Sequence, residues 1–408
     1  MVAAAFTVAV ILQPQYALSQ VPANPAPAAG FQDGFFIQTA DGENRLTIGA
    51  IANIDGRFPL DDEPLATNTF TVRRLRPVFF GRVGRYFEFR VMPDFGNGTA
   101  VIQDAFFDFR LSSRFRIRAG KDKAPIGYEM LILVPRLPFP ERSLASSLVP
   151  NRDVGLQALG EIAGGRVSYA AGVFNGVPDG GTSTADVDTN GAKDVAGRIV
   201  VRPFQSQPAS TSRLEGLGFH IGGSTGRQSG ALPTFRTSVQ QPYFSYLQGA
   251  TTSGTRNRIT PAVFYYRRSF GAFAEYMRST QVVARNGLET DVSNRAWDVT
   301  ASYLLTGETA TTGIMRPKED FDPGAGHWGA FQIAIRYAAL TVDRAAFDAG
   351  LAASGASREA RAVGIAANWY PTAYVRYAVT LERTTFDGSG ASSVRGQTAV
   401  VARGQIAF

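Results

Sequence analysis

The sequence contains no cysteine and few lysine, histidine or tryptophan residues. Without cysteine there are no thiolate metal sites and no cysteine nucleophile, and this composition agrees with an oxidising compartment in which unpaired thiols would not persist. The two histidines, His220 and His327, are too few for a transition-metal site. No stretch of 18 consecutive apolar residues occurs, so the sequence predicts no transmembrane helix.

Positive charge comes almost entirely from arginine. Of 41 Lys and Arg residues only four are Lys, and the formal net charge is +7. One explanation is the codon bias of a GC-rich genome, with which the abundant alanine agrees. The other is a water-filled lumen lined with guanidinium groups that attract anions. The arginines are spread along alternating segments and do not form one basic patch, so no nucleic-acid partner is predicted.

The N-terminal region differs in composition from the rest. Residues 2–12 form an apolar run that is too short to span a bilayer as a helix. With the small residues at 17–19 it predicts a signal peptide over residues 1–19, although the usual basic start is missing. Residues 20–30 are rich in Pro and Ala and are typical of a linker. Residues 31–408 show no further boundary and are expected to form one domain.

Hydrophobicity alternates with a period of two along most of this domain. Phe87, Phe89 and Val91, for example, alternate with Glu88 and Arg90. A soluble sandwich also alternates, but it rarely places arginine at three successive positions of one face beside large aromatic residues. In a membrane barrel the apolar face meets lipid and the charged face meets water. The predicted strands are 44–58, 70–83, 85–95, 101–110, 114–121, 153–162, 166–175, 193–203, 214–226, 257–267, 270–283, 291–306, 327–341, 359–370, 372–386 and 396–408.

This pattern predicts an all-β fold, a sixteen-stranded antiparallel transmembrane β-barrel. The even number of strands fits bacterial outer-membrane barrels, as do short connections on one side and long ones on the other. Residues 307–326 are an exception, being long on the short-turn side, and residues 31–43 are expected to add a hairpin at the base. The aromatic C-terminus, Phe408, is also typical of such barrels.

The charged face of the predicted strands supplies the candidate lumen residues. The predicted lumen arginines are Arg74, Arg76, Arg82, Arg90, Arg114, Arg116, Arg118, Arg376 and Arg403, with acidic partners Glu88, Asp94, Asp104 and Asp108. Two interpretations stay open. The arginines attract anions into the lumen, or they form a neutral ladder of cross-strand ion pairs that stiffens the wall.

Several segments, in this order, resemble the phosphate-selective porin O and P family. They are residues 72–76 (VRRLR), 86–90 (YFEFR), 94–96 (DFG), 103–106 (QDAF), 118–125 (RAGKDKAP), 141–143 (ERS), 150–155 (PNRDVG), 172–176 (GVFNG), 303–308 (YLLTGE), 368–370 (NWY) and 405–408 (QIAF). The resemblance covers about residues 31–408 and is most specific in the first half.

The family resemblance implies a trimer of sixteen-stranded barrels, each with a long third loop, here residues 122–152, folded into the lumen. It also implies arginines that lead anions toward a constriction with lysines. By matching position, Arg73, Arg74 and Arg76 are candidate wall arginines, and Lys121 and Lys123 stand at the start of the loop. Candidates in the returning arm are Arg142 and Arg152. Strict alternation places Arg73 on the lipid side; a β-bulge near Pro77 would remove this conflict.

Two other motifs allow different chemistry. Gly222, Ser224 and Gly226 fit the G-x-S-x-G pattern of a hydrolase, for which only His220 or His327 is available as a base. That motif joins a strand to a helix, and the residues that follow show no helical period. Asp186, Asp188 and Asn190 resemble the start of a calcium loop, but Gly197 stands where that loop needs a glutamate.

The sequence therefore predicts an outer-membrane porin for passive diffusion of small anions, with phosphate or polyphosphate as candidate solutes and no cofactor. The expected partners are outer-membrane lipid, small anions and two further copies of the chain. One alternative is a structural or adhesive barrel whose lumen is plugged by its loops. An outer-membrane esterase is the other.

Overall fold

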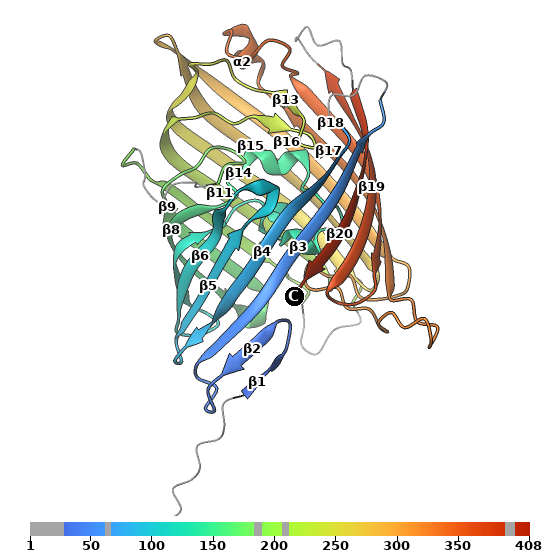
Figure 1. Ribbon diagram of the computed structural model, residues 1–408. Coiled ribbons are helices and arrows are strands. Elements are labelled where there is room, and N and C mark those ends of the chain that lie inside the picture. The colour runs from blue at the N-terminus through green and yellow to red at the C-terminus, as the bar shows by residue number, and fades with distance from the viewer. Residues whose placement is uncertain (1–27, 62–66, 183–189, 206–211, 388–395) are drawn as a thin grey trace, which may run out of the picture.

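The structure is a computed structural model that describes residues 28–61, 67–182, 190–205, 212–387 and 396–408. Within these residues sixteen strands form one closed antiparallel barrel (Figure 1). Each strand pairs with the next along the chain, and the last pairs with the first, with Arg403 opposite Asp55. Closure leaves no free sheet edge in the wall, so backbone polar groups are hydrogen-bonded within lipid.

All sixteen predicted strands are confirmed, with ends that differ by six residues or fewer. The barrel strands are β3 (Arg45–Pro59), β4 (Thr69–Val83), β5 (Phe87–Asp94), β6 (Val101–Arg110), β7 (Arg116–Asp122), β8 (Asp153–Ile162), β9 (Val167–Phe174), β10 (Asp194–Val201), β11 (Leu217–Gly230), β14 (Thr251–Arg267), β15 (Phe270–Arg285), β16 (Leu288–Leu304), β17 (Ala330–Thr341), β18 (Glu359–Tyr370), β19 (Val375–Asp387) and β20 (Gly396–Ala407).

Shorter elements decorate the barrel. A basal hairpin is present, formed by β1 (Ala28–Phe31) and β2 (Phe35–Gln38), and β2 pairs with β3. It was predicted over residues 31–43, and residues 28–30, which were predicted as part of the linker, belong to it instead. A second small sheet consists of β12 (Phe235–Arg236) and β13 (Pro242–Phe244). The short helices are α1 (Tyr128–Leu131), α2 (Arg344–Asp348), η1 (Gly96–Gly98), η2 (Val134–Arg136), η3 (Leu144–Leu148) and η4 (Ala163–Gly165). Among the described residues no helix has the length and apolar character needed to span a bilayer.

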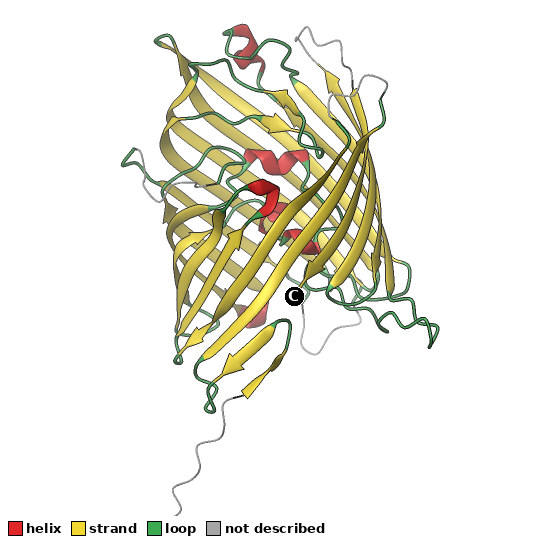
Figure 2. Ribbon diagram, viewed as in Figure 1, coloured by secondary structure: helices red, strands yellow, loops and turns green. Residues whose placement is uncertain are grey.

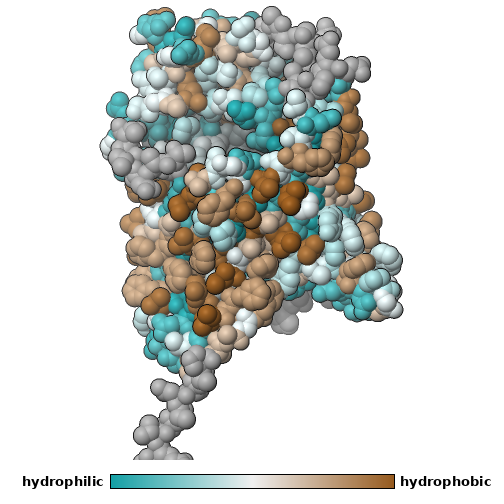
Figure 3. All heavy atoms as spheres, viewed as in Figure 1, coloured by the Kyte–Doolittle hydropathy of each residue, from teal (hydrophilic) through white to brown (hydrophobic). Residues whose placement is uncertain are grey.

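The outer face of the barrel is apolar. Ile335 and Ile365, which alternate with buried residues of β17 and β18, are 62% and 54% exposed. Figure 3 shows such apolar side chains gathered over the middle and lower wall, with polar residues toward the upper end. A band of exposed large apolar groups on a closed barrel is the lipid-facing surface of a membrane protein.

Loop lengths distinguish the two ends of the barrel. Short turns at 84–86, 111–115, 163–166, 268–269 and 371–374 lie at one end, which is the periplasmic end by analogy with other outer-membrane barrels. The basal hairpin, the C-terminus and residues 305–329 share this end (Figure 1). Arg114 lies in one of these turns and is exposed, so its predicted place on a lumen-facing strand is wrong by two residues.

The main apolar core lies between the inner wall and residues 123–152, which connect β7 to β8 and are called the β7–β8 loop below. Ile126 and Leu148 of this loop belong to one buried cluster with Met277 of β15 and Leu340 of β17. Apolar groups on these inward positions give the loop a packing surface, so part of the inner wall is not polar.

Candidate functional site, an arginine-rich lumen

The β7–β8 loop contacts inward-facing side chains around much of the barrel. Its backbone N–H groups at Tyr128 and Glu129 donate to the Glu275 carboxylate of β15, at 2.5 and 3.0 Å. Four and five strands further round the barrel, Arg376 of β19 donates to the Leu137 carbonyl at 2.5 Å, and Gln405 of β20 donates to the Pro135 carbonyl at 3.1 Å. These contacts are those expected of a loop that folds into the lumen, and Figure 2 shows its short helices within the barrel outline.

Glu141 is the centre of the loop's attachment to the wall. Its carboxylate accepts hydrogen bonds from Arg73 at 2.9 Å, Arg74 at 3.1 Å and Arg403 at 2.8 Å, and Arg57 lies 3.8 Å away. Burial alone would raise the pKa of Glu141, but the surrounding arginines outweigh burial and hold the pKa well below its usual range. Glu141 therefore stays ionised and cancels charge that would otherwise face the lumen.

Arg73 points inward because β4 contains a β-bulge at this residue. Asn53 of β3 pairs with Arg74 and the next residue, Ile54, pairs with Val72, so Arg73 has no cross-strand partner. One extra residue turns two consecutive side chains toward the same face. The bulge was predicted near Pro77, which pairs regularly with Ala50, so that location is wrong.

Most of the other candidate arginines are paired with acids. Arg76 lies 2.7 Å from Asp94, Arg90 3.0 Å from Asp104 and Arg152 2.8 Å from Asp104. Asp108 accepts from Arg116 at 3.0 Å and Arg118 at 2.7 Å, while Glu88 lies 2.8 Å from Arg110. Such pairs fix the side chains but leave little net charge, as the neutral-ladder interpretation requires.

The loop cations Lys123 and Arg142 bind the loop's own backbone. Lys123 donates to the carbonyls of Met130 at 2.6 Å and Ile132 at 3.0 Å, and Arg142 donates to the same two carbonyls. Burial lowers the pKa of Lys123 well below its ordinary value. Both side chains therefore hold the loop's shape. Lys121 is buried at the end of β7, and Arg82 is exposed at the end of β4, where it donates to the Gly42 carbonyl.

Three arginines that were not among the sequence candidates have no acidic partner within the described residues. Arg136 of η2 is exposed to the interior, Arg198 of β10 has a buried Nε without a hydrogen bond, and Arg202 follows β10. Arg198 and Arg202 fall in the predicted strand 193–203 and could have been found by alternation. Arg136 lies in a loop with no periodicity, so no sequence pattern indicated it.

These arginines line three neighbouring cavities beside the β7–β8 loop, which share lining residues. A cavity of about 480 Å³ is lined by Arg136, Arg198 and Arg202, with Glu215 as its one acid. A second, of about 280 Å³, shares Arg198 and adds Arg90, Arg118 and Lys123 beside two aspartates. A third, of about 340 Å³, shares Arg136. In each of them basic side chains outnumber acidic side chains, an excess that favours anions.

The hydrolase and calcium motifs are placed differently. Ser224 lies within β11, with no helix after it, and its hydroxyl accepts from Arg258 at 3.3 Å. His220 faces a carbonyl, that of Thr260, at 3.0 Å. Asp186 and Asp188 lie outside the described residues. Among the described residues no group of three or more potential metal ligands occurs.

A family model described as "Phosphate-selective porin O and P" matches residues 47–408. The chain belongs to this family. Its members are not enzymes, and the porin is an outer-membrane β-barrel. No curated protein matches the sequence.

Solved structures resemble the porin in fold. The outer-membrane channel DcaP of Acinetobacter baumannii has a TM-score of 0.57 and 10% identity over 93% of this chain and 100% of that one. An anion-selective porin from Comamonas acidovorans has a TM-score of 0.55 and 12% identity over 89% and 99%. OmpT of Vibrio cholerae in a trimer form has a TM-score of 0.51 and 10% identity over 89% and 99%. At these identities the likeness establishes the fold alone.

Proposed function

We propose that the porin allows passive diffusion of small anions, phosphate among them, through an arginine-lined lumen. The observation that supports this is the excess of cations in the three cavities beside the β7–β8 loop. A guanidinium group presents N–H donors in a fork that fits an oxyanion. Where the arginine has no acidic partner, no carboxylate has to be displaced before the anion binds. Binding remains weak enough for release because these groups lie in open, water-accessible space.

The paired arginines have a different part in this proposal. Arg74, Arg76 and Arg152 are buried and ion-paired, so they build the wall and hold the loop. Arg136, Arg198 and Arg202 supply the field that selects anions. Lys123 donates to two backbone carbonyls of the loop, so in this proposal its part is to hold the loop and not to coordinate a passing phosphate. We also propose a homotrimer, as in the OmpT trimer form.

Selectivity is tested by the reversal potential of single channels under a KCl gradient. We expect chloride preference in the native porin, and Arg136→Gln and Arg198→Gln to lower the chloride-to-potassium permeability ratio by roughly threefold each. A unit charge acting over about 10 Å of aqueous lumen is worth somewhat less than 1 kcal/mol.

Arg361→Gln is the matched control for this measurement. Arg361 is exposed on the outward face of β18 and pairs with Glu359 at 2.7 Å, so the same loss of charge is expected to leave selectivity unchanged. Cation preference in the native porin, or equal effects of all three variants, would contradict the proposal. Titrated phosphate is expected to reduce the chloride current.

A further inference from the structure

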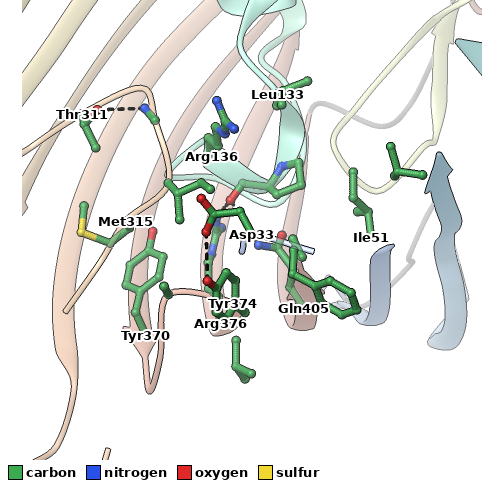
Figure 4. Close-up of a pocket in the computed structure, with 18 of the residues that line it drawn as sticks. Asp33, Ile51, Leu133, Arg136, Thr311, Met315, Tyr370, Tyr374, Arg376 and Gln405 are labelled. Carbon is green, nitrogen blue, oxygen red and sulfur yellow. Dashed lines mark hydrogen bonds between the residues drawn. The ribbon is translucent and has the colours of Figure 1, made fainter. Parts of the chain in front are cut away.

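One cavity of the lumen is amphipathic. It measures about 340 Å³ and lies between the β7–β8 loop, the periplasmic ends of strands and residues 311–315 of the β16–β17 connection. Figure 4 shows Leu133 and Arg136 on the loop side, with Tyr370, Tyr374 and Arg376 on the strand side. Its size falls in the range of pockets that hold a small organic molecule, roughly 300–1,000 Å³.

The apolar part of the lining comes from separate segments of the chain. Ile51 and Val78 form a small buried cluster with Met92 on the inner wall of β3, β4 and β5. Ile314 and Met315, which are half-buried, complete the surface from the β16–β17 connection. An inorganic ion gains nothing from apolar surface, whereas a hydrocarbon ring gains free energy in proportion to the area that leaves water.

The charged part of the lining leaves one cation for a ligand. Arg376 donates a hydrogen bond to the Leu137 carbonyl, and Arg90 forms an ion pair with Asp104. Neither guanidinium group is therefore available to a ligand. The side chain of Arg136 makes no hydrogen bond or ion pair with any described residue, and it remains positively charged at neutral pH.

The acidic side chain in this lining, Asp33, is compensated by a cation. It lies 2.5 Å from Arg316 and accepts from the Tyr374 hydroxyl at 2.9 Å. The hydrogen bond from Arg316 is the largest of the effects that lower the pKa of Asp33, and Tyr374 and Arg136 lower it further. Because Arg316 pairs with Asp33, Asp33 offsets only part of the attraction of Arg136 for an anion.

We propose that this cavity is a subsite for a small organic carboxylate with a ring, of about the size of benzoate. The carboxylate binds Arg136, and the ring packs against Ile314 and Met315. The inference rests on the proposed anion passage and names a class of solute for the lumen. A charge-assisted hydrogen bond fixes one end of the ligand, and burial of the ring distinguishes it from acetate or phosphate.

The test is block of the chloride current in single-channel recordings by benzoate, acetate, phosphate and the neutral benzyl alcohol. We expect benzoate to act at a concentration at least about tenfold below that of acetate, since half-burial of a ring gives that discrimination. Arg136→Lys is expected to retain the block and Arg136→Gln to lose it. Ile314→Asn and Met315→Gln are expected to remove the advantage of benzoate over acetate while the reversal potential keeps its sign.

A control variant and two possible results distinguish a failure of the carboxylate subsite from a failure of the proposed anion passage. Leu288→Asn changes an exposed apolar residue, 75% accessible, at the start of β16 and is expected to alter nothing. Equal block by benzoate and acetate, or block by benzoate that survives Ile314→Asn and Met315→Gln together, would overturn the subsite even if chloride preference holds. A reversal potential on the potassium side would instead overturn the proposed anion passage.

Discussion

Glu141→Gln is expected to increase anion preference and to release part of the β7–β8 loop from the wall. Arg73 and Arg74 would lose the one carboxylate that pairs with them in the described part of the chain, whereas Arg403 would keep Asp55 at 2.6 Å. Glutamine preserves volume and one acceptor oxygen, so the change is mainly electrostatic. Removing one partner of a buried charge network costs about 3–5 kcal/mol. That cost loosens the segment around Glu141, while the buried apolar contacts of Ile126 and Leu148 keep the rest of the loop in place.

Single-channel recording checks this expectation. We expect a higher chloride-to-potassium ratio and a larger, noisier conductance, because a loosened loop samples open arrangements. Glu319→Gln is the control, since Glu319 lies in the periplasmic connection with its side chain 69% exposed. A quiet channel of native conductance would show that Glu141 does not hold the loop.

The same network predicts how the channel responds to acid. The pKa of Glu141 lies well below its ordinary value, so the ion pairs stabilise the attached loop fully above the ordinary glutamate pKa. That stabilisation is lost only as the pH falls through the lowered, folded-state pKa. Conductance governed by this attachment is therefore expected to be constant between pH 5 and pH 8 and to change in strong acid. A titration near pH 6 would require another group.

The sequence predicted the barrel well because a strand's alternation is a local property. Phe87, Glu88 and Phe89 reveal their faces within three positions, and pairing between neighbours follows from the order of the strands. The bulge at Arg73 brings two adjacent guanidinium groups to the carboxylate of Glu141, which is 68 residues away in the sequence. A contact between such distant residues leaves no local pattern from which the bulge could be placed.

The candidate site was predicted in composition but not in detail. Alternation identified arginines that face inward, including Arg76 and Arg90, yet it could not tell a paired from an unpaired one, because their partners come from other strands and from the loop. Arg136 was missed because the β7–β8 loop follows no period. Residues 227–256 are rich in Gly and Ser, a composition typical of mobile surface loops, but Phe235, Tyr243 and Phe244 of this segment are buried.

These aromatic residues belong to residues 231–250, which connect β11 to β14 at the end of the barrel opposite the short periplasmic turns. This segment is called the cap below. Phe235 stacks on Phe244 with centroids 5.6 Å apart, and Tyr243 stacks on Phe386 of β19 at 5.7 Å. The cap reaches β20, where the Thr237 hydroxyl donates to Gln397 at 2.9 Å. Because Gln397 faces inward on a strand remote from β11, the cap extends across the opening.

Removal of the cap is expected to raise single-channel conductance by about twofold or more, since a loop across the mouth lengthens and narrows the path. Gly230 pairs with Thr252, so a turn of a few residues can replace residues 232–249 without strain in the wall. Anion preference is expected to persist, because the cap contains neither Arg136 nor Arg198, and these two residues line cavities toward the periplasmic end. A matched control keeps the cap and carries Arg236→Gln, an exposed position of β12.

The cap deletion also separates a porin from a plugged structural barrel. A porin conducts before the deletion and conducts more after it, whereas a plugged barrel conducts only once the cap is gone. If the native chain and the deletion variant carry the same current, the cap is no constriction and the β7–β8 loop sets the conductance. Glu141→Gln combined with the deletion would then be expected to give no more current than Glu141→Gln alone, because only one narrow region would remain in series.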